Sequence, residues 1–331
     1  MSDFKDILGN EDIIGHFKNA IKSNKVSHAY ILNGEKGMGK KTIAKAFAMT
    51  LQCEENGEEA CLKCHSCLQA LSGNHPDIIW VTHEKPASIG VEDIREQVIN
   101  DIQVKPYSGK YKVYIVDEAV KLTPAAENAF LKTMEEPPDY AVIILLADNV
   151  NMFLPTILSR CIVMNMKPLS EQTIKKYLMS KYEIPDYQAE IAAAFSGGNL
   201  GKAIVLASSE RFNEIRSQVV HFLKYIEEME TYDIIDAVKN VAEYKLDIQD
   251  YIDLMVIWFR DILLYKATKD VGGLLFKDEY SHINKQAINM SYENIDNVLK
   301  AMEKAKTRLK ANVNFDLVLE LMFLEIKDNI L

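Results

Sequence analysis

Residues Gly34 to Thr42 have the types and spacing that suit binding of a phosphate group. The segment reads Gly-Glu-Lys-Gly-Met-Gly-Lys-Lys-Thr and lies between an apolar run, 29–32, and a stretch with helical periodicity, 42–51. Glycines let successive backbone N–H groups face one anion, the following helix N-terminus adds positive potential, and the first lysine supplies a charge for the outer phosphates. The segment therefore predicts a nucleotide-binding P-loop. Its candidate contact residues are Gly34, Gly37, Met38, Gly39, Lys40, Lys41 and Thr42.

One position departs from the P-loop pattern. A Ser or Thr that holds magnesium normally follows the P-loop lysine, whereas here Lys41 stands in that place and Thr42 comes one residue later. A shift of one helical residue turns a side chain by about 100° around the helix axis, so we expect Thr42 to point elsewhere. The sequence predicts a pocket for ATP or ADP with Mg²⁺ whose metal chemistry is impaired.

A second candidate site is a cluster of four cysteines. The spacing Cys53-x7-Cys61-x2-Cys64-x2-Cys67 lets four thiolates converge on one zinc ion. The alternatives are buried free thiols, or His65 in place of one cysteine ligand. A redox pair is disfavoured because the cluster exceeds what thiol exchange needs. With no sign of an open coordination position, the predicted zinc is structural.

Asp117 and Glu118 follow a run of four apolar residues, 113–116. In a nucleotide-hydrolysing site, an aspartate there meets the magnesium ion through water, and the next glutamate polarises the attacking water. Acidic pairs at strand ends are common, so this interpretation depends on the P-loop that precedes them. The pair is a candidate catalytic element.

Arg160 lies in Ser159-Arg160-Cys161, just before another apolar run. One interpretation is a solvated cap, the usual fate of such an arginine. The other is an arginine finger, a guanidinium that neutralises charge developing on a phosphate across a subunit boundary.

The elements that must position these residues alternate between strand and helix as far as residue 164. Apolar runs predict strands at 29–32, 78–81, 113–116, 142–146 and 161–164. Helical periodicity predicts helices at 11–24, 42–51, 91–102 and 124–134. This alternation predicts a parallel sheet covered on both faces, with ligands bound at the carboxyl ends of its strands.

Composition changes after Pro168, where prolines and glycines become rare and helical periodicity continues to the end. We predict an α/β nucleotide-binding domain at 1–167 with the zinc module at 53–67, a small helical domain at 168–208 and an all-helical domain at 209–331. The 331 residues suit two or three domains.

The net charge of −10 disfavours a protein that coats nucleic acid by bulk electrostatics. The N-terminus lacks the apolar core of a signal peptide, and no run of 18 apolar residues occurs. We therefore expect a soluble cytoplasmic protein whose partners are mainly other proteins.

Together these motifs resemble the bacterial clamp-loader branch of the AAA+ ATPases. The resemblance covers residues 1 to about 205, and 314–326 is similar to the final helix of the family's collar domain. The segments that carry it are His28-Ala29-Tyr30, Lys112–Ala119, Leu122-Thr123, Asn128–Pro138 and Leu158–Cys161.

The resemblance implies a RecA-like parallel sheet with an inserted zinc module, a helical lid and a helical collar. It also implies work in a five-subunit complex with gamma/tau motor and delta subunits, which opens the sliding clamp and sets it on primer-template DNA during replication. The resemblance would connect the chain with DNA polymerase III, a DNA-directed DNA polymerase and nucleotidyltransferase, only as a subunit of the holoenzyme. No polymerase site is visible in this sequence.

Three departures from the family pattern bear on ATP hydrolysis. Lys41 replaces the magnesium-binding hydroxyl, Asp148 stands where motors carry Thr or Asn, and Gly201 stands where the lid arginine is expected. An anion site that gains a carboxylate and loses a guanidinium should stabilise hydrolysis poorly. We therefore expect Asp117 and Glu118 to be vestigial and Arg160 to act in trans, on a neighbour's ATP.

Three other functions remain as alternatives. The chain could be an ATP-hydrolysing motor subunit that tolerates Lys41 and Gly201. It could be a free-standing DNA-binding protein built on the zinc module, although its acidic total makes a basic surface less expected. A kinase fits worst, because no acceptor-site residues accompany the P-loop.

Overall fold

The computed structural model describes residues 3–83, 85–311 and 313–330. The chain forms two compact units, of which the first is Met1–Thr173 with Gly197–Lys202 and the second is Ile174–Ser196 with Ala203–Leu331. The lid segment, 168–208, contributes residues to both units. The three-domain division at 167 and 208 stays a prediction.

Within the described residues, the first unit contains one five-stranded parallel sheet in the order β2-β3-β4-β1-β5. The strands are β1 (Ala29–Asn33), β2 (Ile78–Val81), β3 (Lys112–Val116), β4 (Ala141–Ala147) and β5 (Ile162–Asn165). The predicted α/β fold with a parallel sheet is confirmed. Because all strands run the same way, the P-loop after β1 and the acidic pair after β3 lie at one edge of the sheet.

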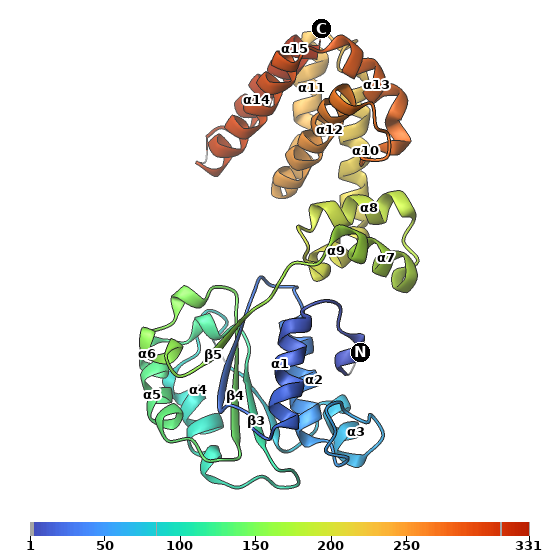
Figure 1. Cartoon of the computed structure of the whole chain (residues 1–331). Helices are drawn as coiled ribbons and strands as arrows, with labels where there is room; N and C mark the ends of the chain where they lie inside the picture. Colours follow the sequence, from blue (N-terminus) through green and yellow to red (C-terminus); the bar gives the residue numbers. More distant parts are fainter. Residues whose placement is uncertain (1–2, 84, 312, 331) are drawn as a thin grey trace. The chain divides into compact units, whose positions relative to one another are not determined.

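Helices cover both faces of the sheet, as Figure 1 shows. One face packs against α1 (Glu11–Lys22) and α2 (Lys40–Gln52), through a core that includes Phe17 and Phe47. The other face packs against α4 (Val91–Ile94), α5 (Pro124–Glu135) and α6 (Pro155–Leu158). The short helix α3 (His65–Ser72) packs against α2.

The segment 91–102 differs from the single helix that its periodicity predicts. It forms α4, then a π-helical turn at Arg95–Ile99 and a 3₁₀ turn at Asp101–Gln103. Its buried residues Ile94, Val98 and Ile102 recur every four positions, which is wider than the 3.6 residues of an α-helical turn. A π turn is wider than an α turn, so it keeps all three side chains facing the core.

The second unit is helical throughout its described secondary structure. The helices after β5 are α7 (Glu171–Tyr182), α8 (Asp186–Phe195), α9 (Leu200–Ala207), α10 (Glu210–Tyr225), α11 (Thr231–Val241), α12 (Ile248–Thr268), α13 (Tyr280–Asn289), α14 (Tyr292–Lys310) and α15 (Phe315–Ile330). Short 3₁₀ turns lie in the first unit at Phe4–Asp6, Ala119–Lys121 and Val150–Met152, and in the second at Ala242–Asp247 and Lys277–Glu279. Gly197, at φ +59°, follows the end of α8, a left-handed position that favours glycine as a helix cap. None of the described helices is long and apolar enough to cross a membrane.

Buried polar side chains fix the helices of the second unit in register. The indole N–H of Trp258 in α12 donates to the Gln286 side chain in α13 over 2.8 Å. The fully buried carboxyl of Asp261 accepts the backbone N–H groups of Leu275 (2.7 Å) and Phe276 (2.8 Å). Because a buried polar group without a partner is costly, these bonds hold the loop after α12 against that helix.

Candidate nucleotide site and metal centre

The P-loop has the backbone geometry of an anion-binding site. β1 ends at Asn33 and α2 begins at Lys40, and between them Gly37 and Gly39 take φ values of +96° and +94°. These left-handed conformations favour glycine. In the described part of the chain, the backbone N–H groups of Gly37, Gly39 and Lys40 have no protein acceptor. Unpaired donors at a helix N-terminus favour a negatively charged ligand.

The side chain of the P-loop lysine is hydrogen-bonded to the backbone of its own loop. The ammonium of Lys40 donates to the carbonyl oxygens of Gly34 and Glu35, the second over 3.0 Å. Burial lowers the pKa of Lys40, and the carboxylates of Asp148 and Asp117 act in the opposite direction. An incoming phosphate would replace the loop carbonyls as the partner of this ammonium.

Lys41 contacts the carboxylate that would face the metal ion in a hydrolysing site. Its Nζ lies 2.6 Å from Oδ2 of Asp117, the carboxylate that was expected to reach magnesium through water. Lys41 thus supplies a positive charge to Asp117 where the family pattern has a hydroxyl. Mg²⁺ needs oxygen ligands in near-octahedral geometry. A site with an ammonium in this position does not suit it.

Glu118 is likewise already paired. Its Oε2 lies 2.6 Å from Nζ of Lys121, and this hydrogen bond lowers the pKa of Glu118. The backbone of Glu118 is left-handed, at φ +47°, a conformation that costs a non-glycine residue about 1 kcal/mol. Lys121 also donates to the carbonyl of Pro86 over 2.7 Å. The predicted water-polarising carboxylate is therefore held by a neighbouring cation.

Gly201, at the position where the lid arginine was expected, touches the P-loop backbone. Its N–H donates to the carbonyl of Gly37 over 3.0 Å, and a Cβ at 201 would lie 2.6 Å from that oxygen. The nearly buried Asn199 donates from Nδ2 to the carbonyl of Lys36 over 2.8 Å. Residue 201 is therefore glycine for a steric reason, because any side chain would push the lid segment off the loop.

Asp148, which stands where motor subunits carry Thr or Asn, directly follows β4 and is exposed. Because β4 lies between β1 and β3, it ends near the P-loop and Asp117. Asp148 and Gly201, two departures from the family pattern, thus both lie on segments near the loop. The sequence contains no signal for the contact between Gly201 and Gly37, which joins segments far apart in the chain.

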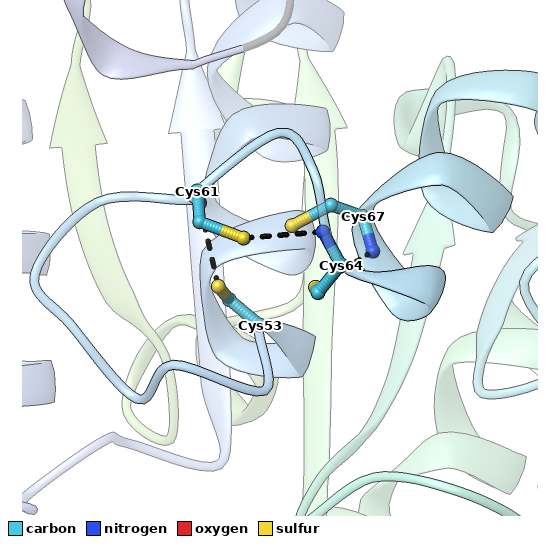
Figure 2. A group of neighbouring side chains, drawn as sticks. All are labelled: Cys53, Cys61, Cys64 and Cys67. Atoms are coloured by element: carbon cyan, nitrogen blue, oxygen red, sulfur yellow. Dashed lines mark hydrogen bonds between the residues drawn. The ribbon is translucent and has the colours of Figure 1, made fainter.

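The four cysteines of the predicted zinc module converge on one point (Figure 2). Their sulfur atoms all lie within 4.8 Å of one another. Four sulfurs around a tetrahedral zinc at the usual bond length of ~2.3 Å lie about 3.8 Å apart. The four cysteines therefore suit zinc once their sulfur atoms move slightly closer together. Backbone N–H groups already donate to the sulfurs of Cys53 (3.3 Å), Cys61 (3.3 Å) and Cys64 (3.4 Å). Such donors stabilise thiolate ligands.

His65 does not join the cluster. It is the first residue of α3 and is exposed, and within the described residues this group of potential ligands consists of the four cysteines. The next residue, Ser66, donates from its hydroxyl to the carbonyl of Gln52 over 2.6 Å and accepts from His75 Nε2 over 2.9 Å, because His75 Nδ1 already accepts the N–H of Asp77. These buried bonds join the cysteine module to the turn before β2. Sequence analysis missed His75, whose signal was its place in the turn Asn74-His75-Pro76-Asp77.

Arg160 lies shortly after α6 and its guanidinium is partly exposed. Nη2 lies 2.6 Å from Oε1 of Glu135, at the end of α5, and Nη1 donates to the carbonyl of Thr156 over 2.9 Å. The Arg160 side chain keeps 31% of its surface accessible. The guanidinium is therefore held at the surface by the Glu135 carboxylate and the Thr156 carbonyl.

The segment that carries Arg160 is anchored to α5. The buried carboxyl of Glu127 accepts the N–H of Leu154, just before α6, over 2.8 Å. Burial raises the pKa of Glu127. Pro155 then starts α6 with the backbone angle that a first helical position requires. The position of Arg160 is thus fixed by the fold rather than by a flexible loop.

Comparison with known proteins places these features in one family. A family model described as "DNA polymerase III, delta subunit" matches residues 9–170, and one described as "DNA polymerase III, delta subunit, C terminal" matches residues 210–328. Together the two models cover most of the chain. The chain therefore belongs to the clamp-loader subunits of DNA polymerase III, a family of AAA+ proteins.

Individual relatives do not separate the members of that family. The chain is 27% identical to DNA polymerase III subunit delta' of Bacillus subtilis, over 94% of each chain. It is 29% identical to subunit tau of the same organism, over 92% of this chain but only 58% of tau. Among solved structures, a gamma subunit-related protein of Thermotoga maritima covers 97% of this chain and is itself covered completely, at 18% identity and a TM-score of 0.41.

Proposed function

We propose that this chain is the delta-prime subunit of a DNA polymerase III clamp loader, which helps to set the sliding clamp on primed DNA. The observation that carries the proposal is the ion pair between Lys41 and Asp117, which occupies the magnesium side of the chain's own phosphate site. The match to the delta' relative over nearly the full length of both chains agrees with it.

The proposal holds that the chain's own ATPase is weak or absent. Hydrolysis needs a metal ion on the phosphates and a carboxylate that polarises water. Lys41 and Lys121 engage both of the carboxylates that would do this work. Gly201 leaves no guanidinium from the lid to neutralise the developing charge.

Arg160 would act on the ATP of an adjacent motor subunit. Its guanidinium reaches the surface on an anchored segment, which suits a group that must meet a neighbour's phosphate. Glu135 would be its partner only while that phosphate is absent. An exposed ion pair contributes about 0.2–1 kcal/mol, so a phosphate can displace the carboxylate readily.

The gamma/tau motor subunits and the delta subunit would be the partners of this chain in a hetero-pentamer. The helices α10 to α15 would form its part of the collar, in agreement with the C-terminal family match at 210–328. The sliding clamp and primer-template DNA would be reached through the complex. The four cysteines would hold a structural zinc that closes the 53–67 module, which hydrogen-bonds to the end of α2 and to the turn before β2.

Reconstitution with the motor and delta subunits tests the proposal. We expect a complex whose mass contains one copy of this chain, and negligible ATP turnover by the chain alone. Failure to enter such a complex would refute the assignment.

A gamma/tau motor is the second candidate, because Gly34, Gly37, Gly39 and Lys40 are all present and tau is an equally similar relative. ATP turnover by the isolated chain at a motor's rate, abolished by Glu118→Gln, would favour it over delta prime. A free-standing DNA-binding protein would instead show a strongly salt-dependent affinity of the isolated chain for DNA.

A further inference from the structure

We propose that the ammonium of Lys41 replaces Mg²⁺ in this P-loop, so that the site binds a nucleoside diphosphate without a divalent cation. The inference rests on the proposed function in one respect, which is that the chain does not hydrolyse ATP in its own site. It assigns a ligand and a binding mode to a site whose catalytic groups are otherwise engaged.

The first step is the position of the charge. Lys41 follows the P-loop lysine directly, where P-loop proteins place the hydroxyl that binds magnesium. Its Nζ already lies 2.6 Å from Asp117, the carboxylate whose usual partner is the metal's water shell. A divalent cation at this place would have to displace the ammonium from Asp117 and would then meet its like charge.

The second step is that the anion-binding part of the loop is intact. In the described residues the N–H groups of Gly37, Gly39 and Lys40 donate to no protein acceptor. The lid segment contacts the loop through carbonyl oxygens instead: Gly201 donates to Gly37, and Asn199 donates to Lys36. Docking of the lid therefore leaves these three donors for a phosphate group.

The third step is the balance of charge, which favours two phosphates over three. Lys40 and Lys41 give the loop two cations, to which the N-terminus of α2 adds positive potential. Asp148 acts electrostatically on the ammonium of Lys40, the group that would meet the outermost phosphate. Its carboxylate would repel a third phosphate that no metal ion neutralises.

Titration of ADP and of ATP into the full chain tests this inference, once in excess EDTA and once in excess Mg²⁺. For the natural chain we expect ADP affinities within about twofold of each other in the two buffers, and weaker binding of ATP than of ADP. Lys41→Thr restores the hydroxyl and should make ADP binding depend on Mg²⁺ by about tenfold or more. Lys41→Met, of similar length without the charge, should weaken ADP binding in both buffers.

Thermal melts of each variant in ligand-free buffer would show that it is folded. No measurable ADP binding by the natural chain would overturn the inference, and so would a magnesium dependence as large as that of Lys41→Thr. Neither result touches the proposed role of Arg160, which is measured in the assembled loader. Conversely, if ATP turnover of the assembled loader did not depend on Arg160, the prediction of metal-free ADP binding would be unaffected.

Discussion

The P-loop and the Arg160 segment belong to the same compact unit and both carry partly exposed ion pairs, but those at the P-loop involve two carboxylates of the nucleotide site, whereas the other involves one guanidinium. At the P-loop, Asp117 and Glu118 are each paired with a lysine, and Lys40 is bound to loop carbonyls. In the Arg160 segment, the guanidinium pairs with Glu135 and donates to the carbonyl of Thr156, and the side chain remains partly exposed.

Under the proposed function, this fold would lose hydrolysis in its own site and keep a contribution to the same reaction in a neighbouring subunit. Hydrolysis in the chain's own site would need several groups to be free at once, so ion pairs to two of its carboxylates would weaken it. Assistance to a neighbour needs one guanidinium at a fixed place on the surface. Substitutions in each region test whether the two act independently.

The largest effect is expected from loss of the proposed zinc, whose four cysteine ligands lie beside the end of α2. Met49 and Cys53, at the end of α2, pack in the same cluster as Cys67. Cys61→Ser should release the zinc and destabilise this cluster by several kcal/mol. Hydrogen exchange of α3 and the end of α2 should accelerate a hundredfold or more, because about 1.4 kcal/mol corresponds to tenfold.

Cys161→Ser is the matched control, since this cysteine lies outside the cluster. It should keep the zinc content of the natural chain, as measured by elemental analysis. Amides of α5 and α6 should exchange at the same rate in the Cys61→Ser variant. Equal acceleration around Arg160 would show that the two regions are not independent.

A smaller effect is expected from Gly201→Ala, because the added Cβ would meet the carbonyl of Gly37 at 2.6 Å. The free energy of unfolding should fall by about 1–3 kcal/mol in urea denaturation. Gly15→Ala, in α1, adds a Cβ with no atom within 4 Å and should be neutral or stabilising by up to about 1 kcal/mol. Equal stability of the two variants would contradict the close contact of the lid segment with the P-loop.

The smallest effect is expected from Glu135→Gln, which removes the carboxylate that holds Arg160. The pair is exposed on both sides, so its loss should change the free energy of unfolding by less than about 1 kcal/mol. ATP turnover of the assembled loader should change by no more than about fivefold, the factor that such an energy corresponds to. A much larger loss of turnover in this variant would mean that Glu135 positions Arg160 for catalysis, rather than pairing with it only while the neighbour's phosphate is absent.

Much of the fold was predictable because its signals are local. Apolar runs gave the five strands, and Pro124 and the Glu-Glu-Pro-Pro segment bounded α5. The spacing of the cysteines indicated a shared metal site, and the structure brings all four sulfurs together. The π turn at 95–99 was missed because a four-residue spacing of apolar side chains also fits a bent α-helix.

Contacts between segments far apart in the chain could not be predicted from the sequence. The departure at Lys41 was evident, but its ion pair with Asp117 depends on how β1 and β3 are placed on either side of β4. The pairing of Arg160 with Glu135, and the packing of Gly201 on Gly37, likewise depend on tertiary structure. Residue type predicted the chemistry of each site, whereas only the fold showed which groups are already engaged.

The most direct test is the ATP turnover of loaders assembled with the natural chain, with Arg160→Ala and with Glu118→Gln. The account predicts that Arg160→Ala assembles normally while the ATP site facing it slows by about a thousandfold, the usual contribution of an arginine finger. Glu118→Gln should leave turnover unchanged. Full turnover with Arg160→Ala, or a loss of turnover with Glu118→Gln, would contradict the claim that this subunit acts on its neighbour's ATP and not on its own.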